Sequence, residues 1–124
     1  MGRKRSIIID CSALLTAIAS DICDDVAAID AELSQLQGDG NTAWTPFGYR
    51  SHRSYLLRLR EDSFSVEQNL SRWAGRPLTD SERIRHQQAV RQLEADGLIV
   101  RDGRQVSLTP AGWQRCGMTP PNSI

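Results

Sequence analysis

The stretch from Leu78 to Gly112 constrains the fold of this chain more than any other part of its sequence. Thr79, followed three residues later by Glu82, has the pattern of a capping box, in which each side chain satisfies a backbone amide at a helix start. The apolar periodicity that follows predicts a helix to Asp96, and Gly97 is placed to end it in a left-handed conformation. This part of the chain therefore contains one helix with both ends specified.

A short β-hairpin is predicted directly after this helix. Asp102-Gly103 separates two short alternating segments rich in β-branched residues. The Asp-Gly pair favours a two-residue type I′ turn, because both central residues of that turn need a positive φ. We expect this register to pair Arg101 with Arg104 and Ile99 with Val106.

Two further helices are expected on either side of this segment. Ser65 and Gln68 form a second capping-box pattern, which predicts a helix from Val66 to about Gly75. Thr109, which is followed by proline, is the expected cap of a last helix. The sequence thus predicts a helix, a turn, a second helix and a hairpin in succession.

One long amphipathic helix dominates the first half of the chain, from about Ser12 to Gln37. Its apolar residues recur at spacings of three and four and form one stripe: Leu15, Ile18, Ile22, Val26, Ile29, Leu33 and Leu36. A stripe of this length favours contact with a second copy of the chain, and ordinary packing within one chain is the alternative. We expect a loop from Gly38 to Ser51 and then a helix from His52 to Glu61.

Charge is divided sharply along a chain whose formal net charge is zero. Residues 3–5 are all basic, and residues 6–49 contain seven acidic residues and no lysine or arginine. Residues 50–124 contain twelve arginines and eight acidic residues, a net charge of +4. This division predicts two surfaces with different tasks, and a solvated acidic helix face is the alternative.

The remaining composition argues against several functional classes. Cys11, Cys23 and Cys116 are widely spaced and form no metal-ligand pattern, so we expect reduced thiols in a cytoplasmic protein. No apolar run approaches the ~20 residues of a membrane span. The only histidines are His52 and His86, and no phosphate loop, zinc spacing or nucleophile motif is present. We therefore expect no enzyme activity, no metal and no cofactor.

The helix from 80 to 96 has a polar face suited to the major groove of DNA. On a helical wheel the core side carries His86, Ala89, Val90, Leu93 and Gly97. The opposite side carries Ser81, Ile84, Arg85, Gln88, Arg91, Gln92 and Ala95, with Gln87 on the flank. Arginine bonds guanine bidentately and glutamine bonds adenine, while an apolar group contacts a thymine methyl. We expect base contacts from Ser81, Arg85, Gln87, Gln88 and Arg91.

Other basic residues are expected to contact the phosphate backbone. Arg101 and Arg104 lie near the predicted hairpin tip, where they would reach phosphate or the minor groove. Arg72 and Arg76 surround the end of the preceding helix. Residues 3–5 are expected either to form a flexible basic arm on DNA or only to aid solubility.

The run AVRQLEADGLIVRDGRQVSLTPAG, from Ala89 to Gly112, resembles winged helix-turn-helix transcription regulators of the MarR/PadR type. In those proteins the recognition helix ends in LxxLExxGLI and is followed by a wing and LTxxG. The matching residues here are Val90, Leu93-Glu94, Gly97-Leu98-Ile99, Leu108-Thr109 and Gly112. The resemblance implies a mostly α fold with a small β-hairpin wing, and a homodimer on pseudo-palindromic DNA with terminal helices at the dimer interface.

These observations predict four parts: a basic arm (1–11), a helix and loop for dimerisation or partner binding (12–51), a winged helix-turn-helix domain (52–117) and a disordered tail (118–124). The predicted function is sequence-specific binding of duplex DNA as a cytoplasmic, homodimeric transcriptional regulator without membrane association. The alternative is a protein–protein adaptor or a small subunit of a phage, plasmid or defence assembly. Zero net charge and the acidic first helix favour that alternative.

Overall fold

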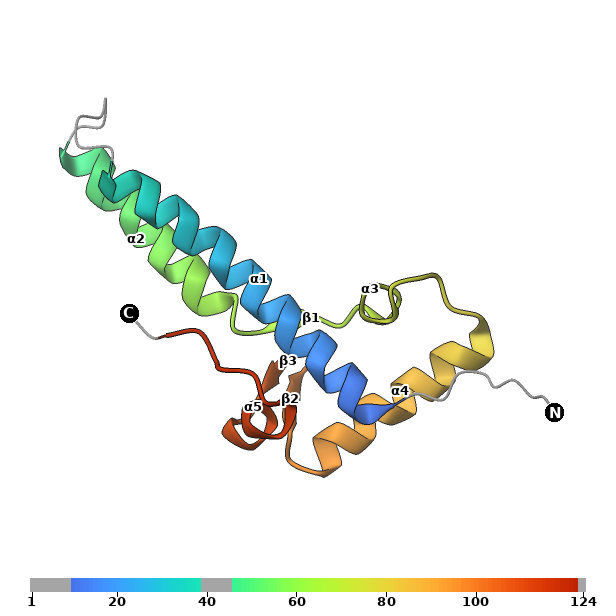
Figure 1. Cartoon of the computed structure of the whole chain (residues 1–124). Helices are drawn as coiled ribbons and strands as arrows, with labels where there is room; N and C mark the ends of the chain where they lie inside the picture. Colours follow the sequence, from blue (N-terminus) through green and yellow to red (C-terminus); the bar gives the residue numbers. More distant parts are fainter. Residues whose placement is uncertain (1–9, 39–45, 123–124) are drawn as a thin grey trace.

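The computed structural model describes residues 10–38 and 46–122. In chain order its elements are α1 (Cys11–Gly38), α2 (Pro46–Asp62), β1 (Val66–Glu67), α3 (Leu70–Ala74), α4 (Asp80–Ala95), β2 (Ile99–Asp102), β3 (Gln105–Leu108) and α5 (Pro110–Cys116). The described part is mostly helical with one small antiparallel sheet (Figure 1). In these coarse terms the predicted fold class is confirmed. The basic residues 3–5 lie outside the described ranges.

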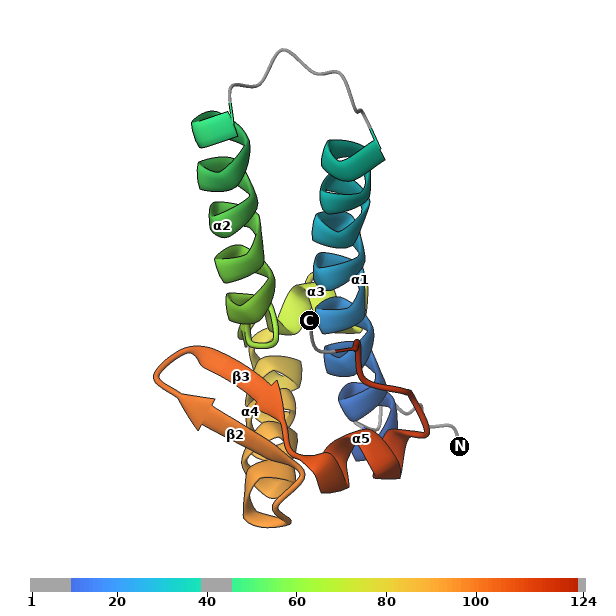
Figure 2. The ribbon, with the colours of Figure 1, turned by 90° about the vertical axis from the view of Figure 1, so that its left-hand side faces the viewer.

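Helix α1 runs through both parts of the molecule. Its first half packs against α3, α4, α5 and the sheet, and together these elements form the body. Its second half packs along α2, and these two helices form an arm that extends from the body (Figures 1 and 2). The body therefore includes the start of α1, and the arm includes α2.

The apolar stripe of α1 is covered entirely by other parts of the same chain. In the body, its first four residues pack with apolar side chains from every other element there, including Val66, Leu70, Val90, Leu93, Ile99, Val106 and Trp113. In the arm, its last three residues pack with Leu56 and Leu57 of α2. All seven stripe residues are at most 8% exposed. Ordinary packing within the chain therefore accounts for the stripe, and a second copy is not needed to cover it.

Helix α2 begins earlier than the sequence predicts. It starts at Pro46 rather than His52, so the last part of the predicted loop is helical. Proline suits the first turn of a helix, because its fixed φ is helical and its missing N–H would have no partner there. The predicted end at Glu61 agrees with the observed end at Asp62 to within one residue.

The predicted capping box at Ser65 is wrong. Val66 and Glu67 instead form β1, which pairs with β3. Helix α3 begins only after Asn69, whose side chain accepts a hydrogen bond from the backbone N–H of Arg72 at 3.0 Å. Pairing with β3 buries the β-branched Val66 and satisfies backbone groups at the sheet edge. This long-range pairing outweighs the local capping pattern.

The β2–β3 hairpin is present, but its predicted register and turn type are wrong. Arg101 pairs with Val106 rather than with Arg104, so each residue's partner lies two positions further along. Because strand side chains alternate with period two, this shift leaves every side chain on its predicted face. Gly103 and Arg104 form the turn, and only Gly103 has a positive φ, of 63°. A turn with glycine first and a negative φ second fits type II′ and excludes type I′.

The predicted caps of α4 and α5 are confirmed. The Glu82 backbone N–H donates to the Thr79 hydroxyl at 3.2 Å, and the Thr79 N–H donates to the Glu82 carboxylate at 3.0 Å. Gly97 follows α4 with a φ of 75°. The Thr109 hydroxyl accepts from the Gly112 N–H at 3.0 Å and donates to the Gly97 carbonyl at 2.6 Å. These bonds fix the direction in which the chain enters and leaves the hairpin.

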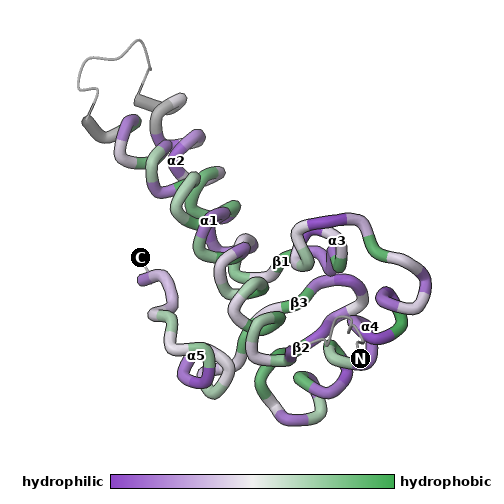
Figure 3. The backbone as a smooth tube through the Cα atoms, turned by 45° about the vertical axis from the view of Figure 1, so that its right-hand side comes forward, coloured by the Kyte–Doolittle hydropathy of each residue, from purple (hydrophilic) through white to green (hydrophobic). Residues whose placement is uncertain are grey.

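Hydropathy follows this packing, with apolar segments gathered where α1 meets the body and α2 (Figure 3). Met118, beyond α5, also packs against the core, although the sequence predicts a disordered tail from that residue. Within the described ranges, no helix combines the length and the apolar character that crossing a membrane requires.

Gly112 provides a test of the body's packing. A Cβ added there would lie 2.0 Å from the Leu98 carbonyl oxygen, so α5 or the backbone before β2 would have to move. We expect Gly112→Ala to lower the free energy of unfolding by about 1–3 kcal/mol, as core overpacking typically does. Urea unfolding followed by circular dichroism measures this change. The neighbouring exposed variant Ala111→Ser is the control, and equal midpoints for the two variants would contradict the described contact.

Candidate nucleic-acid interface

The structure shows the predicted faces of α4 except at Gly97, which is exposed rather than on the core side because it lies beyond the end of the helix. His86, Ala89, Val90 and Leu93 are buried against the body. Every residue of the predicted outer face is exposed, and Gln87 on its flank is half-buried. The outer-face residues are Ser81, Ile84, Arg85, Gln88, Arg91, Gln92 and Ala95. Ile84 is 55% exposed and adds an apolar group to this otherwise polar face. Alternation of buried and exposed positions at helical spacing is what fixes these faces.

The other predicted contact residues come from the elements on either side of α4. Helix α3 and the turn after it carry Arg72 and Arg76, and the hairpin that follows α4 carries Arg101 and Arg104. Figure 1 shows these elements on either side of α4. Helix α3 packs on α4, and α4 packs on β2. The fold thus brings the predicted residues into one neighbourhood around α4.

Each hairpin arginine lies beside a glutamate. Arg101 pairs with Glu94 of α4, with its Nε 3.0 Å from the carboxylate Oε1. Arg104, in the turn, is 3.8 Å from the carboxylate of Glu67 on β1, and both of these side chains are mostly exposed. Arg101 therefore lies along α4 rather than extending beyond the hairpin tip.

Arg76 forms a two-pronged ion pair with Glu82. Its Nη1 and Nη2 lie 3.0 and 2.8 Å from the two carboxylate oxygens. These hydrogen bonds, followed by the bond from the Thr79 backbone, lower the pKa of Glu82 to about 2. The same pair raises the pKa of Arg76. Glu82 is thus ionised at neutral pH, caps α4 and neutralises the arginine that precedes the helix.

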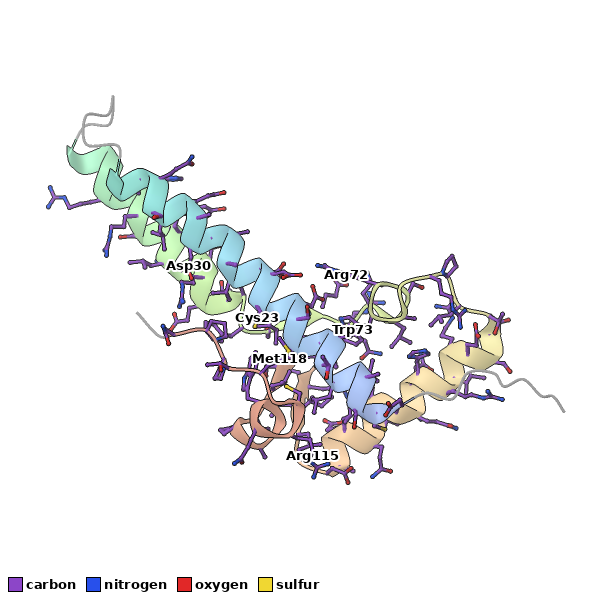
Figure 4. The ribbon with its side chains drawn as sticks, in the orientation of Figure 1. Cys23, Asp30, Arg72, Trp73, Arg115 and Met118 are labelled. Atoms are coloured by element: carbon purple, nitrogen blue, oxygen red, sulfur yellow. The ribbon has the colours of Figure 1, made fainter. Side chains whose placement is uncertain are left out.

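Arg72 pairs with a buried carboxylate on α1. Its Nη2 lies 2.5 Å from Oδ1 of Asp21, whose side chain is only 4% exposed. The indole N–H of Trp73 donates to the other carboxylate oxygen at 3.0 Å. Figure 4 shows Arg72 and Trp73 on α3 beside α1. The contacts with Asp21 therefore hold α3 against α1.

Two polar cavities flank Arg72. One, of about 340 Å³, lies between α1 and the β1–α3 connection and includes Asp25, whose pKa burial and the neighbouring Asp21 raise. The other, of about 210 Å³, lies between α1 and Trp73. Among the residues that the structure describes, no group of three histidine, cysteine or acidic side chains is arranged to hold a metal ion.

All four predicted phosphate-contacting arginines therefore have an acidic partner within the chain. From the sequence, Glu82 is expected only as a cap, and nothing there indicates that Asp21, Glu67 and Glu94 pair with arginines. Asp21 and Glu67 are distant in sequence from the arginines that they meet. Glu94 and Arg101 are seven residues apart, on either side of Gly97, so no helical spacing relates them. The predicted base-contacting residues lie on the outer face of α4, except Gln87, which is half-buried on its flank. On the outer face, Arg91 has no ion-pair partner among the described residues.

His86 lies in the core, as its position on the helical wheel predicts. It is 8% exposed, and its Nδ1 has no hydrogen-bond partner within the described residues. Burial lowers its pKa, with Glu82 opposing the shift and Arg76 adding to it. The imidazole is therefore neutral at pH 7, and its position inside the body keeps it away from the outer face.

No protein-family model matches the chain, and no curated protein or solved structure shows detectable similarity to it.

The lowered pKa of His86 predicts that the free energy of unfolding depends on pH. Below its ordinary pKa of about 6.5, the unfolded chain takes up a proton that the folded chain resists. The free energy of unfolding should therefore fall as the pH is lowered from 7.5 to 5.5. In His86→Gln this part of the pH dependence should be absent, and in His52→Gln it should persist. Urea titrations at each pH measure it, and parallel profiles for wild type and His86→Gln would refute it.

Proposed function

We propose that the chain is a winged helix-turn-helix protein that binds duplex DNA through α4 and regulates transcription. The observation that carries the proposal is the outer face of α4, which exposes arginine, glutamine, serine and Ile84 together. This set offers donors and acceptors for base edges and an apolar group for a thymine methyl.

The order of the elements supports the winged-helix assignment. After β1, the short α3 and the longer α4 are joined by a turn from Gly75 to Thr79, and the β2–β3 hairpin follows α4 directly. This is the element order expected of a helix-turn-helix followed by a wing, in which α4 would be the recognition helix. In the sheet β3 lies between β1 and β2, so β1 anchors the hairpin to the body.

The ion pairs predict weak binding to arbitrary DNA. Phosphate contacts supply most of the affinity of non-specific complexes, and they come from basic side chains that can release counterions. Here the four arginines around α4 each face a carboxylate, and the whole chain has no net charge. We therefore expect base contacts from α4 to contribute a large share of the binding energy at a specific site.

The first test is fluorescence anisotropy of a labelled random duplex at several salt concentrations. Binding should weaken as salt rises, with a slope that reports a small number of phosphate contacts. Arg91→Ala and Arg85→Ala should each weaken binding, by about 1–3 kcal/mol at a specific site if they contact guanine. Arg58→Ala, on α2, removes the same charge far from α4 and is the matched control. No binding at low salt, or unchanged affinity in both α4 variants, would overturn the proposal.

Homodimerisation remains part of the proposal but rests on a different surface. The stripe of α1 is covered, whereas Tyr55 and Leu59 of α2 are 58% and 37% exposed. They are four residues apart and so share one helix face, and the His52 ring stacks on Tyr55 with centroids 6.1 Å apart. A second copy packed on this patch would cover apolar area that α1 leaves exposed. The two bodies would then lie at the ends of paired arms.

Light scattering after size exclusion tests this dimer. Wild type should have twice the 13.8 kDa mass of one chain, and Tyr55→Asp combined with Leu59→Asp should elute as a monomer. Circular dichroism checks that the double variant remains folded. A monomeric wild type would refute the dimer, and if it also failed to bind DNA, the adaptor function would become the leading explanation.

A further inference from the structure

We propose that Glu94 is a restraint on non-specific DNA binding: it holds Arg101 of the hairpin and competes with DNA phosphates for it. This inference rests on the proposed function and assigns a role within it to an acidic residue. Its basis is the ion pair at 3.0 Å between two elements that would both lie against the duplex. Neither charge is deeply buried, because the two side chains are 29% and 40% exposed.

Glu94 lies at the margin of the proposed base-reading face. It follows Arg91 by three residues and Gln87 by seven, so all three lie along one side of α4. Gln87 is half-buried and Arg91 exposed, which places Glu94 where the outer face meets the hairpin. A duplex contacting Arg91 would therefore approach the Glu94 carboxylate as well.

The direction of the Arg101 side chain follows from the alternation of side chains along β2. Arg101 opposes Val106 and shares a face with Ile99, which is buried in the core. The guanidinium is thereby directed along α4 instead of outward from the tip. Had Arg101 opposed Arg104, as the sequence predicts, it would lie beside the turn and closer to the tip.

The chemistry of the pair explains why Glu94 and a DNA phosphate compete for Arg101. A guanidinium binds a carboxylate and a phosphate through the same fork of N–H donors, so Arg101 cannot satisfy both fully. An exposed ion pair is weak enough to exchange partners when another anion is presented. On any duplex, Arg101 must give up its bond to Glu94 before it can bind a phosphate. The loss of that bond offsets part of the phosphate contact, whatever the base sequence.

Glu67 and Arg104 repeat the arrangement at the hairpin tip. Their charges are 3.8 Å apart and highly exposed, so this pair is looser than the first. The backbone N–H of Gln68 donates to the Arg104 carbonyl at 2.7 Å, which ties the turn to the chain that carries Glu67. Both arginines of the wing are therefore accompanied by an acidic residue on the neighbouring element.

The test compares Glu94→Gln with Glu32→Gln on a labelled random duplex. Both variants lose one negative charge, but Glu32 is an exposed residue in the second half of α1, within the arm. Glu94→Gln should raise affinity at low salt by about three- to ten-fold. It should also steepen the plot of log K against log salt by about 0.9, the value for one added phosphate contact. Glu32→Gln should change neither quantity appreciably.

The double variant Glu94→Gln/Arg101→Ala identifies the cause of any gain. If Glu94 acts by holding Arg101, the double variant should lose the added affinity and the steeper slope. A gain that survives loss of Arg101, or equal effects of Glu94→Gln and Glu32→Gln, would overturn the inference while leaving DNA binding intact. Failure of wild type and of Glu94→Gln to bind at low salt would instead overturn the proposed function, and this inference with it. Glu67→Gln, tested against Arg104→Ala in the same way, provides an independent pair if Glu94→Gln does not fold.

Discussion

The apolar stripe of α1 is the constraint on which the rest of the structure depends. A single helix of 28 residues is too long to be covered by the body alone, so its stripe is divided between two partners. The first half completes the core beneath α4 and the sheet, and the second half is covered by α2. Each buried leucine or isoleucine contributes up to about 1.5–3 kcal/mol, so the whole stripe is a major source of stability. The position of every other element follows from where it meets this helix.

The candidate site depends on α1 through one polar contact in an otherwise apolar interface. Asp21 interrupts the buried surface of α1, and a carboxylate there needs partners, which Trp73 and Arg72 supply. Because both partners are on α3, the contact sets the position of α3 against α1, and α3 in turn packs on α4. A residue predicted from sequence to contact phosphate thus also has a structural role.

Local patterns in the sequence predict local structure well in this chain and fail where distant segments meet. The caps at Thr79 and Thr109 are confirmed because each involves only residues within one helical turn. The cap at Ser65 has the same pattern and is wrong, because Val66 pairs with Val106, far along the chain. The hairpin register is wrong for a related reason: an Asp-Gly pair defines a favourable turn, but packing of the strands on the body decides which residues occupy it. The outer face of α4 was predictable because burial at helical spacing defines it.

The separation of acidic and basic residues along the sequence is not kept in the folded structure. The acidic first half and the arginine-rich second half suggest separate surfaces, but folding brings them together. Asp30 of α1 pairs with the buried Arg60 of α2 at 2.6 Å, and Asp21 pairs with Arg72 of α3. The net charge of +4 over residues 50–124 therefore overstates the positive potential available to a partner, because two acids from α1 offset part of it.

The local ion pairs extend this neutralisation to the site itself. Glu82, Glu94 and Glu67 lie beside the arginines that surround α4, whereas Arg91 on its outer face has no such partner in the described chain. A surface of this kind attracts polyanions weakly and leaves discrimination to the few side chains that reach base edges. If α4 reads DNA, the acids beside its neighbouring arginines lower its affinity for every duplex, and the side chains that it exposes supply the selectivity.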